Sequence, residues 1–372
     1  MADKLNVAIV GCGGISRYHL ANILKTPAMQ LTATMDVIES AARERAEEGG
    51  AGYHTTDLGR VLSDPGVDAV IICSTHSTHA EISLESVAAG KHVFCEKPPM
   101  MTVAEAHAIQ KSVSESDVQY MGAWWFKHSP VTIRLRDVIE KPYFILFTVR
   151  IPPEQNRRNK VMFGPDAGPG AHRVDDPEGP YGADGVFDNG GYALYWIWHV
   201  MRSQPVEIYA MGYGGKPTST STIVIRFENG GVANSVFSDV GSGGIVPKYY
   251  GEVLAGSVSA ATNRFRSLVF EGTDAEGFEE IYSEGTGILN DASGKPYRAG
   301  FDEEMEMFAK LCLEGGPNPM DVWEASVPTL IFEKAVQSMR ERRPVAVDIR
   351  EACWTPDGKL PKSVATFGDC VK

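Results

Sequence analysis

The sequence predicts a protein of the α/β plus α+β class, with an N-terminal doubly wound parallel sheet and a C-terminal domain built on an open mixed β-sheet. Its 372 residues are more than one domain usually holds. Up to residue 122, short apolar runs alternate with helical stretches of about 10–15 residues, which is typical of a parallel sheet. Beyond it, strand-like runs follow one another across turns. We therefore predict domains at 1–122 and 123–350 and a C-terminal tail at 351–372.

The first domain is expected to contain five strands with helices between them. The runs LNVAIV at 5–10 and VDAVIIC at 67–73 are apolar enough for buried strands, and Gly90 is a natural end for the helix before it. The expected strands are 5–10, 31–35, 67–73, 92–95 and 118–121, and the expected helices are 15–25, 41–48, 79–89 and 103–113.

The second domain is expected to mix strands and helices. The sequence ENGG at 228–231 is a hairpin signal, and Pro328 should kink or break the last helix. The segment 152–185, rich in Gly, Pro and Asp, is expected to be a long loop and a candidate lid that governs specificity. The expected strands are 143–151, 206–213, 222–227, 232–237 and 268–271, and the expected helices are 186–201, 302–313 and 321–340.

Charge and composition exclude several classes of partner. The net charge of −13 disfavours nucleic acid and anionic membranes. Neither a signal peptide nor a run of ~18 apolar residues is present, so we expect a cytoplasmic protein. Of the six cysteines none forms a C-x-x-C pair, and Cys12, Cys73 and Cys95 are expected to be buried free thiols. No cluster has metal-ligand spacing, so we predict no metal.

A glycine-rich turn follows the first predicted strand and opens a helix. GCGGIS at 11–16 matches the first two glycines of G-x-G-x-x-G, with Ser16 in the third place, and Asp36 ends the next strand at the spacing of a ribose-binding carboxylate. A carboxylate there repels a 2′-phosphate, so NAD is favoured over NADP. The alternative is that Asp36 merely ends its strand and caps the next helix. The candidate cofactor contacts here are Gly11, Gly13, Gly14, Ile15, Ser16 and Asp36.

A lysine follows the fourth predicted strand. Glu96-Lys97-Pro98 lies at the C-terminal end of the strand 92–95, where open parallel sheets bind their ligands. An exposed polar turn is the alternative reading of these residues.

Three segments together resemble the glucose–fructose oxidoreductase / inositol dehydrogenase / MocA family. They are GCGGIS at 11–16, the run from Ser74 that ends in AGKHVFCEKP at Pro98, and DNGGY at 188–192. The resemblance implies an NAD(P)-dependent oxidoreductase with a Rossmann domain and an open mixed sheet that covers the nicotinamide. It adds these candidate cofactor contacts: Ser74, Thr75, His76, His79, Glu96 and Lys97. His76 replaces the commoner Asn, so it either takes that place near the cofactor or fills space.

The resemblance also implies roles for three residues. Lys97 would contact the substrate hydroxyl and the nicotinamide ribose. Many members have D-x-G-x-H in the second domain, with His as the acid/base; here Tyr192 stands in its place, as in a tyrosine-type subgroup. Asp188 would hold a second substrate hydroxyl.

The residues themselves support a site at 188–192. Asp188 and Tyr192 are spaced i, i+4, so a helix places them on one face. Gly190 and Gly191 each destabilise a helix by roughly 1 kcal/mol relative to Ala, which indicates that something packs very closely there, and a cofactor ring or substrate is one candidate. A fraying first turn against the sheet is the alternative. An ammonium from Lys97 would favour the phenolate of Tyr192, the form that can accept a proton.

Further candidates for substrate contact are Trp124, Lys127 and His172. Trp124 and Lys127 belong to an aromatic stretch after the last strand of the first domain, for which linker packing is the alternative. His172 lies in the long loop.

These observations predict an NAD-dependent oxidoreductase that moves a hydride between nicotinamide and a secondary alcohol or ketone of a sugar, polyol or derivative. The alternatives are an NAD-dependent, redox-assisted glycosidase or lyase, and a non-catalytic NAD(P)-binding sensor. A homo-oligomer is expected, because an open sheet face would otherwise expose apolar residues.

Overall fold

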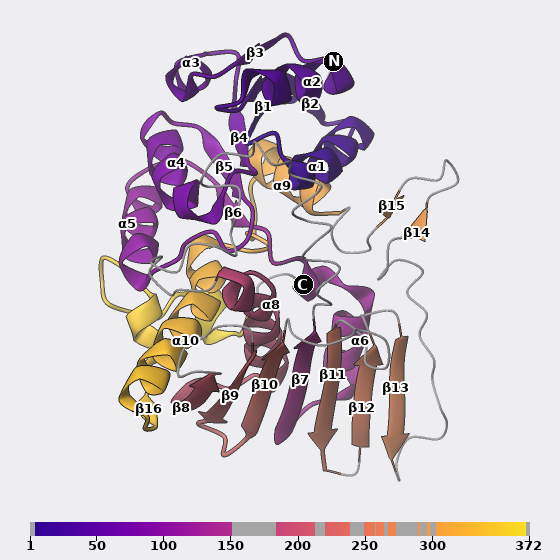
Figure 1. The fold of residues 1–372 in the computed structure, drawn as a ribbon, viewed down its shortest axis with the longest axis vertical. Coiled ribbons are helices and arrows are strands. Elements are labelled where there is room, and N and C mark those ends of the chain that lie inside the picture. The colour runs from indigo at the N-terminus through magenta and orange to yellow at the C-terminus, as the bar shows by residue number, and fades with distance from the viewer. Residues whose placement is uncertain are drawn as a thin grey trace.

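The computed structural model describes residues 4–150, 184–212, 220–238, 249–256, 258–263, 267–272, 289–290, 296–297 and 303–369. Two sheets dominate the fold (Figure 1).

The first sheet is parallel, and its strand order is β3-β2-β1-β4-β5-β6. Its strands are β1 (Leu5–Val10), β2 (Met29–Met35), β3 (Tyr53–Thr55), β4 (Ala69–Ile72), β5 (His92–Cys95) and β6 (Tyr120–Gly122). The connecting helices are α1 (Gly14–Lys25), α2 (Glu39–Gly49), α3 (Leu58–Leu62), α4 (His76–Ala88) and α5 (Val103–Ser114). The doubly wound sheet is confirmed, with β3 and α3 as additions that were not predicted. The order reverses between β1 and β4, and this switch point is where such sheets bind ligands.

The second sheet is mixed, with the order β13-β12-β11-β7-β10-β9-β8-β16. Only β7 with β10 is a parallel pair among those described. The strands are β7 (Phe144–Arg150), β8 (Pro205–Gly212), β9 (Thr220–Phe227), β10 (Val232–Ser238), β11 (Tyr249–Ala255), β12 (Val258–Asn263), β13 (Ser267–Gly272) and β16 (Val345–Ala346). A separate hairpin pairs β14 (Leu289–Asn290) with β15 (Pro296–Tyr297). The predicted hairpin turn between β9 and β10 is confirmed, and Gly230 in it has φ +84°.

Two helices cover one face of the mixed sheet (Figure 1). They are α8 (Asp184–Met201), which packs on β7 and β10, and α10 (Val322–Glu341), which packs on β8. Alternate strand residues such as Phe147 and Ile225 are buried beneath these helices, while Leu146, Val224 and Met211 point to the other face and are half-buried or exposed.

The chain crosses between the two sheets more than once. After β6, η1 (Trp125–His128) and α6 (Pro130–Val138) lead into β7. Late in the chain, α9 (Glu304–Glu314) returns to pack on α1 and β1 of the first sheet (Figure 1), and α10 contacts both α5 and β6. Part of the segment assigned to the second domain therefore completes the first one.

The predicted break at Pro328 is wrong, because α10 runs from Val322 to Glu341 without interruption. Proline inside a helix destabilises it by about 3 kcal/mol or more. Here the neighbours Val327 and Leu330 are buried in the core, and this packing holds the helix together.

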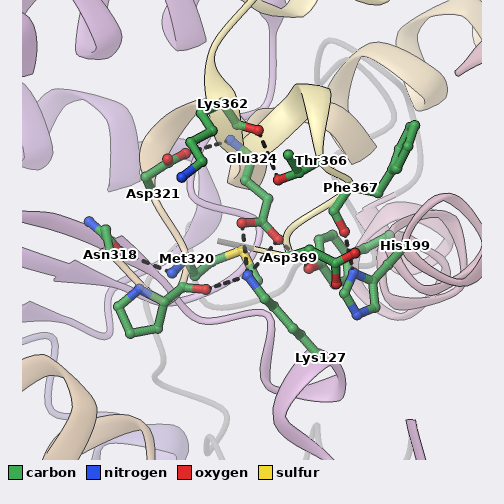
Figure 2. Close-up of polar contacts among 12 residues, drawn as sticks. Lys127, His199, Asn318, Met320, Asp321, Glu324, Lys362, Thr366, Phe367 and Asp369 are labelled. Carbon is green, nitrogen blue, oxygen red and sulfur yellow. Dashed lines mark hydrogen bonds and ion pairs between the residues drawn. The ribbon is translucent and has the colours of Figure 1, made fainter. Parts of the chain in front are cut away.

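The C-terminal segment packs against the body of the protein. It contains η3 (Ile349–Ala352), which contacts α5 and α10, and α11 (Lys362–Ala365), which contacts α10. His199 of α8 lies 2.7 Å from the carbonyl oxygen of Phe367 (Figure 2), and Asp369 pairs with Arg136 at 2.9 Å. None of the described helices is long and apolar enough to cross a membrane.

Candidate active site

The glycine loop joins β1 to α1 at the switch point of the first sheet. Gly11 has φ +89°, and a Cβ there would lie 2.6 Å from the carbonyl carbon of Cys73, so only glycine fits. Gly13 is the N-cap of α1; no side chain caps this helix, and its first turn, which contains Gly14, Ile15 and Ser16, holds no acidic residue. Its N-terminal N–H groups are thus available to an anion.

Asp36 lies next to this loop, directly after β2. Its carboxylate accepts hydrogen bonds from the backbone N–H groups of Cys12 (2.7 Å) and Ile38 (2.9 Å). The neighbouring Val37 is 81% exposed. The predicted acidic residue therefore lies at the loop, but its carboxylate also ties the loop to the end of β2.

A second turn of the same kind follows β4. Thr75 is the N-cap of α4, but its side chain makes no capping hydrogen bond to the helix. The hydroxyl of Ser74 accepts a hydrogen bond from the hydroxyl of Thr78 at 2.8 Å. His76 and His79 are buried and meet ring to ring, with centroids 5.6 Å apart. The two nitrogens of His79 lie 2.9 Å from the carbonyl oxygen of Pro98 and 3.1 Å from that of Ser74. His79 thus links the turn after β4 to the turn after β5.

The turn after β5 holds a buried carboxylate and a half-buried lysine, joined to Pro98 by a cis peptide bond. Glu96 bonds to Nε2 of His19 at 2.7 Å and accepts from the N–H of Lys97 at 3.0 Å. Burial alone would raise the pKa of Glu96, but the bond to His19 and the nearby charges of His19 and Lys97 outweigh it, so the pKa is lowered from its ordinary value. His19 is fully buried here.

The aromatic cluster next to this turn brings Lys97 and Tyr192 together. The ammonium of Lys97 lies 4.9 Å from the ring centroid of Tyr192, within cation–π range. The Tyr192 ring, 7% exposed, stacks on Phe126 at 4.4 Å and meets the edge of Trp124 at 5.4 Å. Asp188 is in α8, one turn before Tyr192, and its side chain lies outside the described residues. The contacts with Phe126, Trp124 and Lys97 thus hold the ring of Tyr192 in place.

Lys127, in contrast, is directed into the protein. Its ammonium donates to both carboxylate oxygens of Glu324 at 2.9 Å and to the carbonyl of Pro319 at 2.6 Å (Figure 2). The hydroxyl of Tyr195 also donates to Glu324, at 2.5 Å. Lys127 is 6% exposed, and its ammonium is bonded to these acceptors. We therefore do not propose that Lys127 contacts the substrate.

The other two substrate candidates fare differently. Trp124 is fully buried and donates its ring N–H to the carbonyl of Ala325 at 3.1 Å, so it supports Tyr192 rather than lining an open site. His172 and the predicted lid at 152–185, apart from its last two residues, lie outside the described residues.

Two buried charged residues at this edge were not predicted. Arg45 of α2 lies beneath the glycine loop, with its Nε 3.0 Å from the hydroxyl of Ser16. Glu304 of α9 is fully buried, and within the described part of the chain its carboxyl has no hydrogen-bond partner. Burial, followed by the nearby charge of Glu96, raises the pKa of Glu304 well above its ordinary value. The sequence gives no signal for Arg45, because α2 has a mainly polar composition and only its approach to the glycine loop buries this side chain.

The expected thiols are present in the described structure as free cysteines. Cys12, Cys73 and Cys95 are buried, and burial raises the pKa of Cys12 and of Cys95 to about 12. In the described part of the chain, no group of three or more His, Cys, Asp or Glu side chains is arranged to hold a metal ion.

Comparisons with known proteins agree with this architecture. Residues 5–123 match the model of an oxidoreductase family with an NAD-binding Rossmann fold, GFO_IDH_MocA. The chain is 23% identical to myo-inositol 2-dehydrogenase of Thermotoga maritima, over 92% of this chain and 99% of that protein. It is 33% identical to the NAD⁺-dependent scyllo-inositol 2-dehydrogenase of Bacillus subtilis, over 32% of this chain and 35% of that protein. A levoglucosan dehydrogenase solved with NADH shares the fold, with a TM-score of 0.75 and 20% identity over 93% of this chain and all of that chain.

Proposed function

Since the chain belongs to the Gfo/Idh/MocA oxidoreductases, with its NAD-binding Rossmann domain at residues 5–123, we propose that it is an NAD-dependent dehydrogenase of a sugar, a polyol or a related derivative. The reaction would move a hydride between nicotinamide and a secondary alcohol or the matching ketone. The inositol dehydrogenases among its relatives support this substrate class.

The residues at the switch point fit a dinucleotide. The N-terminus of α1 and the loop that starts at Gly11 would hold the diphosphate, because no side chain caps this helix and no acidic residue lies in its first turn. The carboxylate of Asp36 would accept hydrogen bonds from the ribose hydroxyls. Its negative charge disfavours a 2′-phosphate, and the neighbouring Val37 offers no positive charge to bind one. Ser74, Thr75 and the turn at Lys97 would flank the nicotinamide half. When bound, NAD supplies the hydride acceptor for alcohol oxidation.

One observation carries the chemical proposal: the ammonium of Lys97 lies 4.9 Å from the centroid of the Tyr192 ring. A positive charge next to a phenol favours the phenolate, which can take the proton of a substrate hydroxyl. In the direction of reduction, the Tyr192 hydroxyl would return that proton. Asp188, one turn earlier on α8, would hold a second hydroxyl and orient the reacting carbon.

The proposal is tested by following near-ultraviolet absorbance of the protein with NAD or NADP and a panel of inositols, sugars and anhydrosugars. We expect NADH to form with one substrate class. Tyr192→Phe should lower kcat by about 10²–10⁴-fold, as for loss of an acid/base group, and leave the dissociation constant of NADH near that of the unmodified protein.

Tyr249→Phe is a matched control, because it removes a hydroxyl next to the same ring, one that donates to Asn189 at 3.1 Å. Its kcat should stay close to that of the unmodified protein. A Tyr192→Phe variant with unchanged kcat would contradict the assignment. Cleavage of a glycoside without net NADH would instead favour a redox-assisted glycosidase or lyase.

A further inference from the structure

Arg45 places a buried positive charge directly beneath the glycine loop. It lies on α2 and is 2% exposed. Its Nε donates to the hydroxyl of Ser16 at 3.0 Å, and its Nη2 donates to the carbonyl of Cys12 at 3.3 Å. Nη1 forms an ion pair with Glu48, one turn further along α2. One guanidinium therefore contacts the loop after β1 and the first turn of α1 together.

Ser16 extends this contact across the loop. Its hydroxyl accepts from Arg45 and donates to the carbonyl of Gly13 at 2.6 Å. Ser16 stands where the dinucleotide fingerprint has its third glycine, so a residue that departs from the motif is the one that receives the arginine. The carbonyl oxygens of Cys12 and Gly13 thus each accept a side-chain hydrogen bond, from Arg45 and from Ser16 respectively, and these bonds fix the turn before α1.

Burial of an arginine is unfavourable unless its donors are satisfied. Three groups of Arg45 meet acceptors, but the acidic partner, Glu48, is 43% exposed on the side chain and sits away from the loop. The guanidinium itself is too buried to receive a 2′-phosphate directly. Its effect on a bound dinucleotide must therefore pass through the loop and through its charge.

We propose that Arg45 is a positioning residue for the diphosphate of a dinucleotide. It would hold the Gly13–Ser16 turn in the shape that binds the diphosphate, and its charge would add to that of the α1 N-terminus. This inference rests on the proposed cofactor site and adds a residue that the fingerprint does not contain.

The test is direct binding, by quenching of protein fluorescence on titration with NADH, NADPH, ADP-ribose and adenosine. Arg45→Leu should raise the dissociation constants of NADH, NADPH and ADP-ribose by the same factor, roughly tenfold or more, because the variant removes two loop contacts and a charge. Adenosine, which has no phosphate, should bind with nearly unchanged affinity. Arg43→Leu is the matched control: Arg43 is exposed on the same helix, so it alters net charge equally and should have little effect.

Two further variants guard against a folding defect. Ser16→Ala leaves Arg45 in place and should weaken NADH binding by a smaller factor. Combined with Arg45→Leu, the two effects should be less than additive, because each variant alone already removes the contact between Arg45 and Ser16. Arg45→Lys keeps the charge and should recover part of the affinity.

The outcomes separate the two claims. If the unmodified protein binds neither NADH nor ADP-ribose, the proposed function fails, and the role of Arg45 fails with it. If the unmodified protein binds both, but Arg45→Leu and Ser16→Ala bind as tightly, only the role of Arg45 is overturned. Equal loss of adenosine and ADP-ribose affinity would also overturn it, because a merely structural defect would affect both ligands alike.

Discussion

Lys97 and Lys127 lie at the same aromatic cluster, formed by Trp124, Phe126, Tyr192 and Tyr195, but in opposite environments. Lys97 is half-buried at the edge of the first sheet, with its ammonium against the Tyr192 ring. Lys127 is buried and its ammonium is enclosed by Glu324 and the Pro319 carbonyl. The charge of Lys97, which lies over the Tyr192 ring at the sheet edge, is placed to act on a ligand. The charge of Lys127 is paired with Glu324 in the interior and joins two elements of the fold.

The aromatic rings connect the two lysines. Glu324 accepts from Tyr195, whose ring is parallel to that of Trp124 at 6.1 Å between centroids, and Trp124 in turn lies nearly perpendicular to the ring of Tyr192. The interior ion pair therefore supports the ring on which the edge lysine lies. This difference predicts that the first lysine controls the reaction and the second controls stability.

The largest expected effect is that of Lys97→Met on turnover. We expect kcat to fall by about 10²–10⁴-fold, because in the proposed mechanism Lys97 supplies the charge that would favour the phenolate of Tyr192. The thermal midpoint should change little, since Lys97 is half-buried. Steady-state kinetics and calorimetry on one preparation check both parts. A variant that loses stability but keeps kcat would reverse the roles assigned to the two lysines.

Lys127→Met should act on stability instead. Removing one partner of a buried ion pair destabilises a protein by about 3–5 kcal/mol, because Glu324 is left buried without its cation. Urea-induced unfolding measures this loss, and kcat of the folded variant should change little.

The matched control for this prediction is the double variant Lys127→Met with Glu324→Leu. It should recover part of the lost stability, since no unpaired charge is left in the interior. If the double variant is less stable than Lys127→Met, the ion pair is not the main contribution of these side chains.

Glu304 is a third buried ionisable side chain, whose carboxyl has no hydrogen-bond partner among the described residues, and it predicts a pH effect. Burial, followed by the negative charges of Glu96 and Glu303, raises the pKa of Glu304 well above its ordinary value. The folded state therefore keeps a proton that the unfolded state releases above the ordinary glutamate pKa, so this residue makes stability fall as pH rises through that window. Glu304→Gln carries no such proton, and its stability relative to the unmodified protein should improve by up to about 1.4 kcal/mol per pH unit across the window.

Unfolding of both proteins between pH 4 and pH 9 measures the effect of Glu304. The two curves should be most alike at the acidic end and diverge as pH rises. Parallel curves would show that Glu304 does not titrate differently in the folded protein.

Local sequence patterns predicted most of the fold and part of the candidate site. The strand and helix positions of the first domain follow from apolar periodicity, and the turns at Gly11 and Lys97 follow from motifs. The role of Lys127 could not be predicted, because its partner Glu324 is 197 residues away in the chain and no local pattern pairs the two side chains. The packing of α9 against the first sheet could not be predicted either, because helical periodicity does not indicate which distant segment a helix contacts.

The sequence also could not distinguish which polar residues are buried. Arg45 stands between apolar and charged neighbours in a helix that has a mainly polar composition, and only the approach of α2 to the glycine loop buries it. Pro328 shows the reverse case, in which a strong local signal is overridden by packing on both sides. Local rules thus hold where the chain contacts itself nearby and fail where distant segments meet.

The smallest expected effect concerns the choice of cofactor at Asp36, the acidic residue at the outer end of the same edge. Asp36→Asn removes a charge but keeps an oxygen that can accept from the N–H groups of Cys12 and Ile38. The ratio of the NADPH to the NADH dissociation constant should therefore fall by roughly tenfold, about 1.4 kcal/mol, as a like-charge repulsion is lost. Glu39→Gln, which neutralises an exposed carboxylate three residues away, should leave the ratio nearly unchanged. If Asp36→Asn weakens both cofactors equally, Asp36 acts by fastening the glycine loop, and the charge that selects NAD must come from elsewhere.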